Sequence, residues 1–119
     1  MVRRFGELTA RLYALEALLR HGTELIDVAA AEELSRDSAA AASLQVAAAK
    51  ALAQEFAVEI ANGVFELTGT SATDRALALD RHWRNVRVHS LHDPARWKYV
   101  HLGNHTLHGT RPPVLGVLL

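Results

Sequence analysis

The amino-acid sequence predicts an all-α fold, a four-helix bundle that residues 1–119 form as a single domain. Half of the residues are hydrophobic, which is enough for one compact core. The apolar residues recur at helical spacing over long stretches. Residues that start or end helices stand between these stretches, and they divide the chain into four helices.

The first helix is predicted over residues 2–33. Its apolar side chains follow three- and four-residue steps, the spacing of one stripe on a bundle helix. This stripe contains Phe5, Leu8, Leu12, Leu15, Leu19 and, two turns later, Ile26. Because Glu7, Arg11 and Glu16 interrupt the apolar residues, the segment resembles neither a signal peptide nor a membrane-spanning helix. We therefore expect a soluble, cytoplasmic protein without a membrane partner.

The second helix is predicted to begin within residues 34–38 and to end at Leu67. Ser35, Asp37 and Ser38 can accept hydrogen bonds from the free amides of a helix start. The polar stripe of this helix is narrow, and it consists of Glu55, Glu59, Asn62 and Glu66. Apolar residues and alanines cover the remaining circumference, which predicts a helix buried on several sides. In so small a protein this favours a subunit or domain interface, and hence a homo-oligomer.

A turn around Gly69 is predicted to separate the second helix from the third. Gly69 is placed to end the second helix in a left-handed conformation, which glycine adopts without steric strain. Ser71 and Asp74 have the spacing of a capping box, so we expect the third helix to begin there. The apolar face of this helix consists of Leu79, Trp83 and Val86.

The third helix is predicted to stop at Asp93, because Pro94 disfavours helical geometry in the residue before it. Proline suits the first turn of a helix, so Asp93 becomes the expected cap of a fourth helix over residues 94–108. Gly109 and a pair of prolines soon after it end this helix. An apolar tail, residues 114–119, follows.

The composition excludes several classes of function. The 13 basic residues balance 13 acidic ones, which argues against a nucleic-acid partner. The absence of cysteine excludes disulfides, thiolate catalysis and cysteine zinc sites. Six of the seven histidines follow Ser71, so the candidate chemistry lies in the last part of the chain.

Three arginines form a regular pattern on the third helix. Arg81, Arg84 and Arg87 recur at every third position, so they lie along one side and could face an anionic group. A solvated salt-bridge face has the same pattern, since Asp80 precedes Arg84 by four residues and can pair with it. The spacing leaves both interpretations open.

Two groups of histidines are further candidates. His89 and His92 share one helical face in the last turn before Pro94, where the helix dipole favours a protonated imidazole. Either a functional pair or hydrogen-bonded structural groups would fit this position. A second row on the fourth helix could supply ligands for zinc or nickel, and it contains His101, His105 and His108. No acidic or cysteine ligand accompanies this row, so a polar helix face or a packed interface is the favoured interpretation and no metal site is predicted.

A longer motif carries a family resemblance. Residues 79–94 read LDRHWRNVRVHSLHDP, and this run resembles a segment near the end of the dibenzothiophene-monooxygenase-like flavin-dependent monooxygenases, a branch of the acyl-CoA dehydrogenase superfamily. Residues 65–69, FELTG, and residues 102–107, LGNHTL, resemble the segments before and after it. The first two helices match this branch only in pattern.

The resemblance implies the C-terminal four-helix bundle of an oxidoreductase. In the complete enzyme this bundle packs against a flavin that an N-terminal helical domain and a β domain also hold. Such enzymes receive reduced flavin, FMN or FAD, from a separate flavin reductase and use oxygen to oxygenate a sulfur-containing or aromatic substrate. We expect the chain to be a fragment, a truncated product or one piece of a split enzyme, and to be inactive alone.

The resemblance also implies roles for individual residues. His92 matches the histidine beside the reactive flavin, where it would act as an acid or base, and His89 lines the same pocket. Gly69, Ser71 and Arg84 are the implied cofactor-binding residues. Ser71 departs from the family pattern, because some relatives carry there an arginine that meets the flavin phosphate.

Two alternative functions follow from other features. An acyl-CoA dehydrogenase proper would need a carboxylate base near the flavin, whereas the motif carries histidines. A non-enzymatic helical oligomer or metal-binding module would use the apolar face of the second helix and the histidine row of the fourth.

Overall fold

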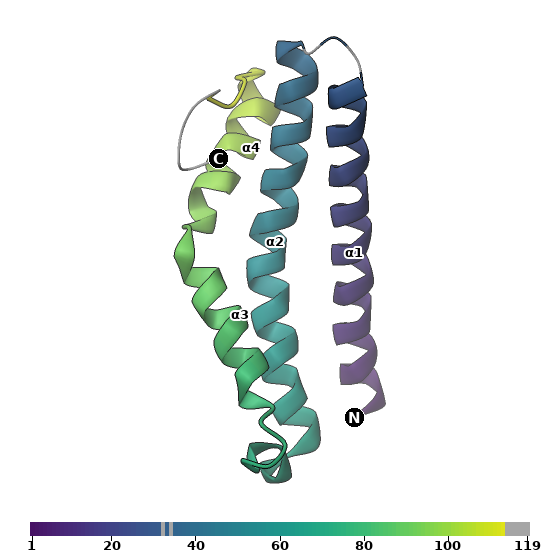
Figure 1. The fold of residues 1–119 in the computed structure, drawn as a ribbon, viewed down its shortest axis with the longest axis vertical. Helices are drawn as coiled ribbons and strands as arrows, with labels where there is room; N and C mark the ends of the chain where they lie inside the picture. The colour runs from purple at the N-terminus through teal and green to yellow at the C-terminus, as the bar shows by residue number, and fades with distance from the viewer. Residues whose placement is uncertain (32, 34, 114–119) are drawn as a thin grey trace.

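The computed structural model describes residues 1–31, 33 and 35–113, and every regular element in these residues is a helix. In chain order the elements are α1 (Val2–Ala31), α2 (Arg36–Thr68), the short 3-10 helix η1 (Thr70–Thr73), α3 (Asp80–His92) and α4 (Ala95–His108). The predicted all-α class with four α-helices is confirmed (Figure 1). The predicted apolar tail, residues 114–119, lies outside the described residues. Within them, no helix is long and apolar enough to cross a bilayer.

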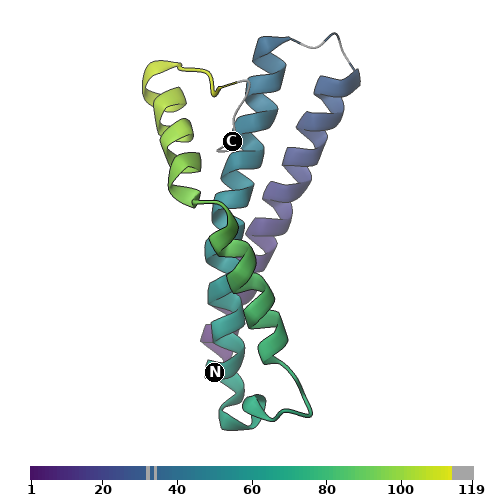
Figure 2. The same ribbon diagram turned by 60° about the vertical axis from the view of Figure 1, so that its left-hand side comes forward.

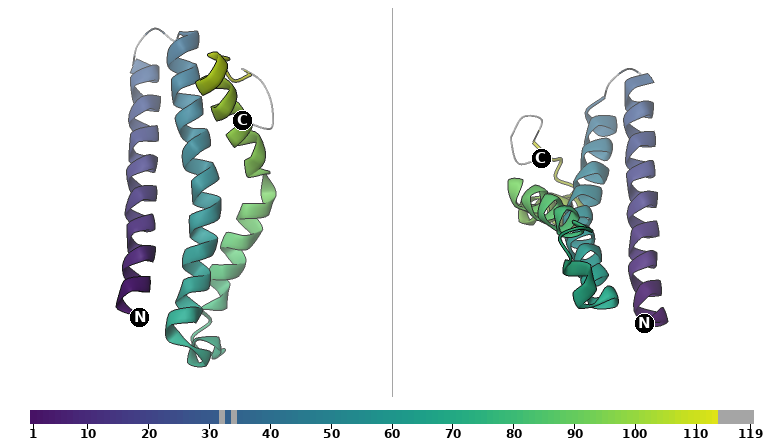
Figure 3. Two further views of the ribbon diagram at one scale, coloured as in Figure 1. Left: turned by 180° about the vertical axis from the view of Figure 1, so that it is seen from behind. Right: turned by 60° about the horizontal axis from the view of Figure 1, so that its bottom comes forward.

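The central helix of the molecule is α2. Helix α1 lies antiparallel to it on one side, and α3 and then α4 follow each other along another side (Figures 1 and 3). The chain bends between α3 and α4, and both of these helices contact α2 (Figure 2). The broad apolar surface predicted for α2 is therefore covered in part by the chain's own helices.

Helix α1 packs on α2 through small and branched residues that recur every seven positions. These buried residues are Leu8, Leu15, Gly22 and Ala29. Of the apolar stripe predicted for this helix only Leu8 and Leu15 are buried, since a second row beside them stays exposed. That row consists of Phe5, Leu12, Leu19 and Ile26. The physical reason is that α1 rests mainly on one neighbour, so one of its two apolar rows faces α2 and the other does not.

The boundaries of α2 agree with the local signals in the sequence. Ser35 accepts a hydrogen bond from the Ser38 amide, and the Ser38 hydroxyl accepts one from the Ser35 amide, at 3.0 and 3.2 Å. This is the reciprocal capping box that satisfies free amides at a helix start. At the other end, Gly69 has the positive φ of 71° that was expected, but its ψ of −161° is extended rather than left-handed helical. Helix α1 ends at Ala31, two residues before the predicted end.

The predicted start of α3 is wrong. Residues 70–73 form η1, and α3 begins only at Asp80 without a side-chain cap. The Ser71 hydroxyl donates to the carbonyl of Thr68 at 3.0 Å, and Asp74 accepts from the amide of Ala76 at 2.9 Å. Serine and aspartate side chains can bind nearby backbone groups in turns as well as in caps, and here the turns prevail. The predicted apolar face is nevertheless correct, because Leu79, Trp83 and Val86 line a groove of about 340 Å³ with residues of α1 and α2.

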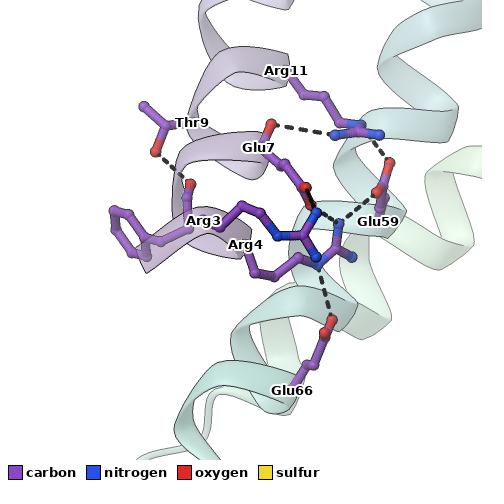
Figure 4. Close-up of polar contacts among 8 residues, drawn as sticks. Arg3, Arg4, Glu7, Thr9, Arg11, Glu59 and Glu66 are labelled. Atoms are coloured by element: carbon purple, nitrogen blue, oxygen red, sulfur yellow. Dashed lines mark hydrogen bonds and ion pairs between the residues drawn. The ribbon is translucent and has the colours of Figure 1, made fainter. Parts of the chain in front are cut away.

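The polar stripe of α2 joins helices rather than facing solvent alone. At the start of α1, Arg4 donates to Glu59 and to Glu66, each at 3.1 Å, and Arg11 lies 2.7 Å from the second carboxylate oxygen of Glu59 (Figure 4). The carboxylates of Glu66 and Glu59 raise the pKa of Arg4. Glu7 adds a third carboxylate from α1 itself, 3.4 Å from Arg4. This network fixes the register of α1 on α2.

Two other residues of the same stripe, Asn62 and Glu55, bind side chains of α3 and α4. The Trp83 indole of α3 donates to Asn62 at 2.7 Å, and the Tyr99 hydroxyl of α4 donates to Glu55 at 2.6 Å. Burial and the neighbouring Glu55 carboxylate together raise the pKa of Tyr99 to about 12. The tyrosine therefore stays a neutral donor to Glu55 across the physiological range.

Candidate functional site

The candidate catalytic histidines lie at the C-terminal end of α3. His89 and His92 are both exposed, and they belong to the last turn of the helix. Val88 and Leu91 beside them are 72% and 67% exposed, the largest exposed fractions among the apolar residues of α3. An exposed surface that combines imidazoles with large apolar side chains is suited to contact a ligand or another protein segment. The structure thus brings the two predicted histidines together on an uncovered surface.

The arginine row of α3 is exposed and makes local contacts. Arg84 lies 3.2 Å from the carboxylate of Asp80, which is the pair expected from the spacing. Arg87 donates to the hydroxyl of Ser90 at 3.4 Å, and Arg81 lies 3.3 Å from the ring of His82. Because each guanidinium carries five donors, these contacts leave most of their donors available for an anion.

The predicted cofactor-binding residues, Gly69, Ser71 and Arg84, and the predicted catalytic histidines are spread along η1 and α3. Gly69 and Ser71 lie at the η1 end of α2, while His89 and His92 lie at the far end of α3, which spans about 20 Å for its 13 residues. Arg84 stands between them. The structure therefore distributes these residues over η1 and the length of α3, and it does not gather them around one point.

The three histidines of the α4 row differ in exposure and in contacts. His101 is half-buried, whereas His105 and His108 are exposed. His105 Nδ1 lies 3.2 Å from the carbonyl of Thr110, where the chain turns at Gly109 in the expected left-handed conformation. Within the residues that the structure describes, no group of three histidine or carboxylate side chains is arranged to hold a metal ion.

Asp93 does not cap α4, which corrects the prediction. Its carboxylate oxygen Oδ2 accepts from Lys50 of α2 at 2.5 Å and lies 2.9 Å from Lys98 of α4. Gln54 of α2 donates to the Asp93 backbone carbonyl at 3.0 Å. Asp93 and Lys98 are only 7% and 1% exposed. Two ammonium groups attract the carboxylate more strongly than the backbone amides of α4 would, so the side chain turns to α2.

The ammonium groups of Lys50, which donates a hydrogen bond, and of Lys98, which forms an ion pair, lower the pKa of Asp93 from 3.8 to about 2. Because the pKa is lower in the folded state, the stabilisation from this pairing is complete above about pH 4 and is lost as the pH falls through 2. We expect a loss of about 2 kcal/mol from this group across that interval. Urea unfolding of the wild type and of Asp93→Asn at pH 6, 4, 3 and 2 measures it. The stability gap between the two proteins should narrow below pH 4, and a constant gap would contradict the pairing.

Three residues of these contacts were not singled out from the sequence: Lys50, Gln54 and Lys98. Lys50 had a usable signal, since it is an isolated cation within an alanine-rich stretch of the most apolar helix. Lys98 and Gln54 gave no comparable signal, because lysine and glutamine are common on exposed helix faces. Their partners come from elements far apart in the sequence.

Comparison with known proteins identifies the fold and its relatives. Residues 2–97 match the family model described as "Acyl-CoA dehydrogenase, C-terminal domain". A dibenzothiophene monooxygenase of Rhodococcus erythropolis is 37% identical over 113 residues, which cover 93% of this chain and 27% of the relative. A probable FMNH2-dependent monooxygenase, SfnC of Pseudomonas putida, is 34% identical over 94% of this chain and 29% of its own length.

Solved structures give the same result. The methanesulfinate monooxygenase MsuC of Pseudomonas fluorescens superposes with a TM-score of 0.92 at 34% identity, over 96% of this chain and 30% of that protein. The dibenzothiophene monooxygenase TdsC of a Paenibacillus species superposes at 0.87 with 29% identity, over 93% of this chain and 29% of its own, and it has also been solved with FMN and with indole. The chain thus spans less than a third of the length of these relatives. It belongs to the family of acyl-CoA dehydrogenase C-terminal domains.

Proposed function

We propose that this chain serves as the C-terminal bundle of a flavin-dependent monooxygenase that acts on a sulfur-containing or aromatic substrate. The observation that carries the proposal is the exposed pair His89 and His92 beside the uncovered Val88 and Leu91 at the end of α3. Similarity over nearly the whole chain to monooxygenases of sulfur compounds supports it. FMN is the favoured flavin, since SfnC is described as FMNH2-dependent and TdsC has been solved with FMN.

The residues of this chain fit one wall of a flavin pocket. Reduced flavin would supply the electrons that activate oxygen, while His92 would hold or release a proton beside it. Val88 and Leu91 would keep water away from the same surface. Towards the start of α3, Arg84 offers a cation. The backbone around Gly69 and Ser71 is exposed, so an anionic group could reach it.

Partners belong to the same proposal. The β domain and N-terminal domain of such an enzyme would complete the pocket, either within a longer polypeptide or as a separate chain. A flavin reductase would supply reduced flavin in the cytoplasm. Exposed apolar residues on α1 and α3 support association with a further subunit or domain, and a homo-oligomer would cover them.

A chimera tests this function directly. The corresponding C-terminal segment of the Rhodococcus dibenzothiophene monooxygenase is replaced by this chain, and the chimera is assayed with reduced FMN, oxygen and dibenzothiophene. We expect FMN binding and substrate-dependent oxygen consumption, because this chain would supply the same wall of the pocket. The 119-residue chain alone should neither retain FMN nor consume oxygen with substrate.

The parent enzyme without its C-terminal segment is the matched control, and it should be inactive. A chimera that folds and assembles like the parent but shows no oxygenation would argue against the proposal. Stoichiometric flavin and oxygenase activity in the isolated chain would also overturn it, since the other domains would then be unnecessary.

A further inference from the structure

The buried polar residues of this protein are concentrated at one place. Among the described residues, the polar or charged side chains that are buried are Gln54, Asp93 and Lys98. All three meet at the junction between α3 and α4, where Asp93 has an extended backbone between the two helices. Lys50 completes the group from α2. A protein with a largely alanine and leucine core therefore places its buried charges at a single bend.

The ion cluster of Lys50, Gln54, Asp93 and Lys98 contributes no more to stability than an apolar contact of the same size would. Taking charged groups out of water has a large desolvation cost, and apolar residues of similar size stabilise a core at least as well. The cluster also leaves polar atoms incompletely bonded, because Gln54 Oε1 and Asp93 Oδ1 accept no hydrogen bond within the described residues. Lys98 meets Asp93 as an ion pair rather than through a well-directed hydrogen bond. Such an arrangement is better explained by a need for a defined geometry than by stability alone.

The cluster controls the end of α3 that carries the histidines. No residue of α3 is buried, and its first half is held to α2 by Trp83 and Asn62. Val88 and Leu91 near the end of α3 are exposed, so the contacts of Asp93, the residue after the helix, provide the attachment to α2 there. His92 immediately precedes that residue.

We propose that Lys50, Asp93 and Lys98 are positioning residues, which fix the α3–α4 junction on α2 and thereby the location of the His92 imidazole. This inference deepens the proposed function and rests on it for the role of His92. A catalytic group displaced by about 1 Å loses on the order of a hundredfold in rate, so a rigid attachment next to His92 has a direct catalytic consequence. The positioning itself is a property of this chain and can be measured without any activity.

Distance measurements in the 119-residue chain test the positioning. The chain has no cysteine, so Ala17→Cys on α1 and Leu91→Cys on α3 provide two specific sites for spin labels. Lys50→Met is expected to broaden the distance distribution and to displace its mean, and Lys50→Arg should restore the wild-type distribution. Arg96→Met removes one exposed charge from α4 without contacting Asp93, and it should leave the distribution unchanged.

Asp93→Asn provides a second variant, with circular dichroism to show that it remains helical. Unchanged distributions in Lys50→Met and in a folded Asp93→Asn would overturn the inference. If Asp93→Asn unfolds, the distance distribution of Lys50→Met alone tests the inference, and an unchanged distribution would overturn it.

The chimera supplies the catalytic readout. There, Lys50→Met should lower coupled substrate oxygenation about tenfold or more and raise hydrogen peroxide release, with the Kd for FMN unchanged. A purely structural role would instead weaken FMN binding and turnover together. An inactive unmutated chimera would contradict the proposed function while the distance measurements still test the positioning. If Lys50→Met changes the distance between the spin labels but leaves coupled substrate oxygenation in the chimera unchanged, the proposed effect of the cluster on His92 would be overturned.

Discussion

Replacing His92 by alanine is expected to lower kcat/KM for substrate oxygenation by about 10²- to 10⁴-fold, the range for loss of a positioned acid or base. The residue lies exposed in the last turn of α3, directly before the Asp93 attachment to α2. Steady-state oxygen consumption and product formation in the chimera measure the effect. FMN affinity should change little, because an imidazole that moves a proton contributes mainly to the reaction step.

His108→Ala is the matched control for this experiment. It removes an exposed imidazole from the end of α4, outside the proposed pocket, and it should leave kcat/KM within about twofold of the unmutated chimera, as surface substitutions usually do. His89→Ala should give an intermediate loss, since His89 lines the pocket without the proposed proton transfer. Added imidazole should restore part of the activity of His92→Ala. A His92→Ala chimera that retains full coupled activity would remove His92 from the mechanism.

The helix pattern of this fold was predictable because most of its boundaries are set by local chemistry. Ser35 and Ser38 form a capping box whatever surrounds them, and Gly109 adopts the left-handed conformation that ends α4. The start of α3 was not predictable on the same basis. Ser71 and Asp74 bind backbone groups in turns with geometry that competes with a helix cap, and spacing alone does not decide between them.

The contacts between helices were predictable only in part. The narrow polar stripe of α2 was visible in the sequence, but its role was not, because the partners of Glu59 and Asn62 come from two different helices, α1 and α3. Asp93 shows the same limit. Its position before a proline indicated a helix cap, whereas Lys50, 43 residues earlier, determines where its carboxylate points.

The sequence predicts that His89 and His92 share one helical face, but it does not predict what surrounds this face. Three-residue spacing puts His89 and His92 on one face of any helix. That this face is uncovered, and that it ends at a buried ion cluster, depends on how α3 and α4 pack along α2. How the end of α3 is attached to α2 therefore depends on tertiary contacts, and the spacing of residues in the sequence does not predict these contacts.

A close contact between α1 and α2 leads to the largest expected loss of stability. Gly63 is buried on α2 against Leu8, and a Cβ atom at position 63 would overlap the Leu8 side chain. Because Leu8 is itself buried, its terminal methyl groups have little room to move. Gly63→Leu is therefore expected to lower the free energy of unfolding by about 3 kcal/mol, even though leucine is the better helix former. Urea unfolding followed by circular dichroism measures this change.

The matched substitution on α4 should have the opposite sign, which separates packing from helix propensity. Gly103 lies within α4, and apart from its chain neighbours and its own helical backbone nothing lies within 4 Å of the position that a Cβ atom would take, so Gly103→Leu should raise stability by up to about 1 kcal/mol. Adding Leu8→Ala to Gly63→Leu should recover part of the loss, because the smaller side chain vacates the volume that the new leucine needs. Equal stabilities for Gly63→Leu and the wild type would show that α1 and α2 are not packed this closely in solution.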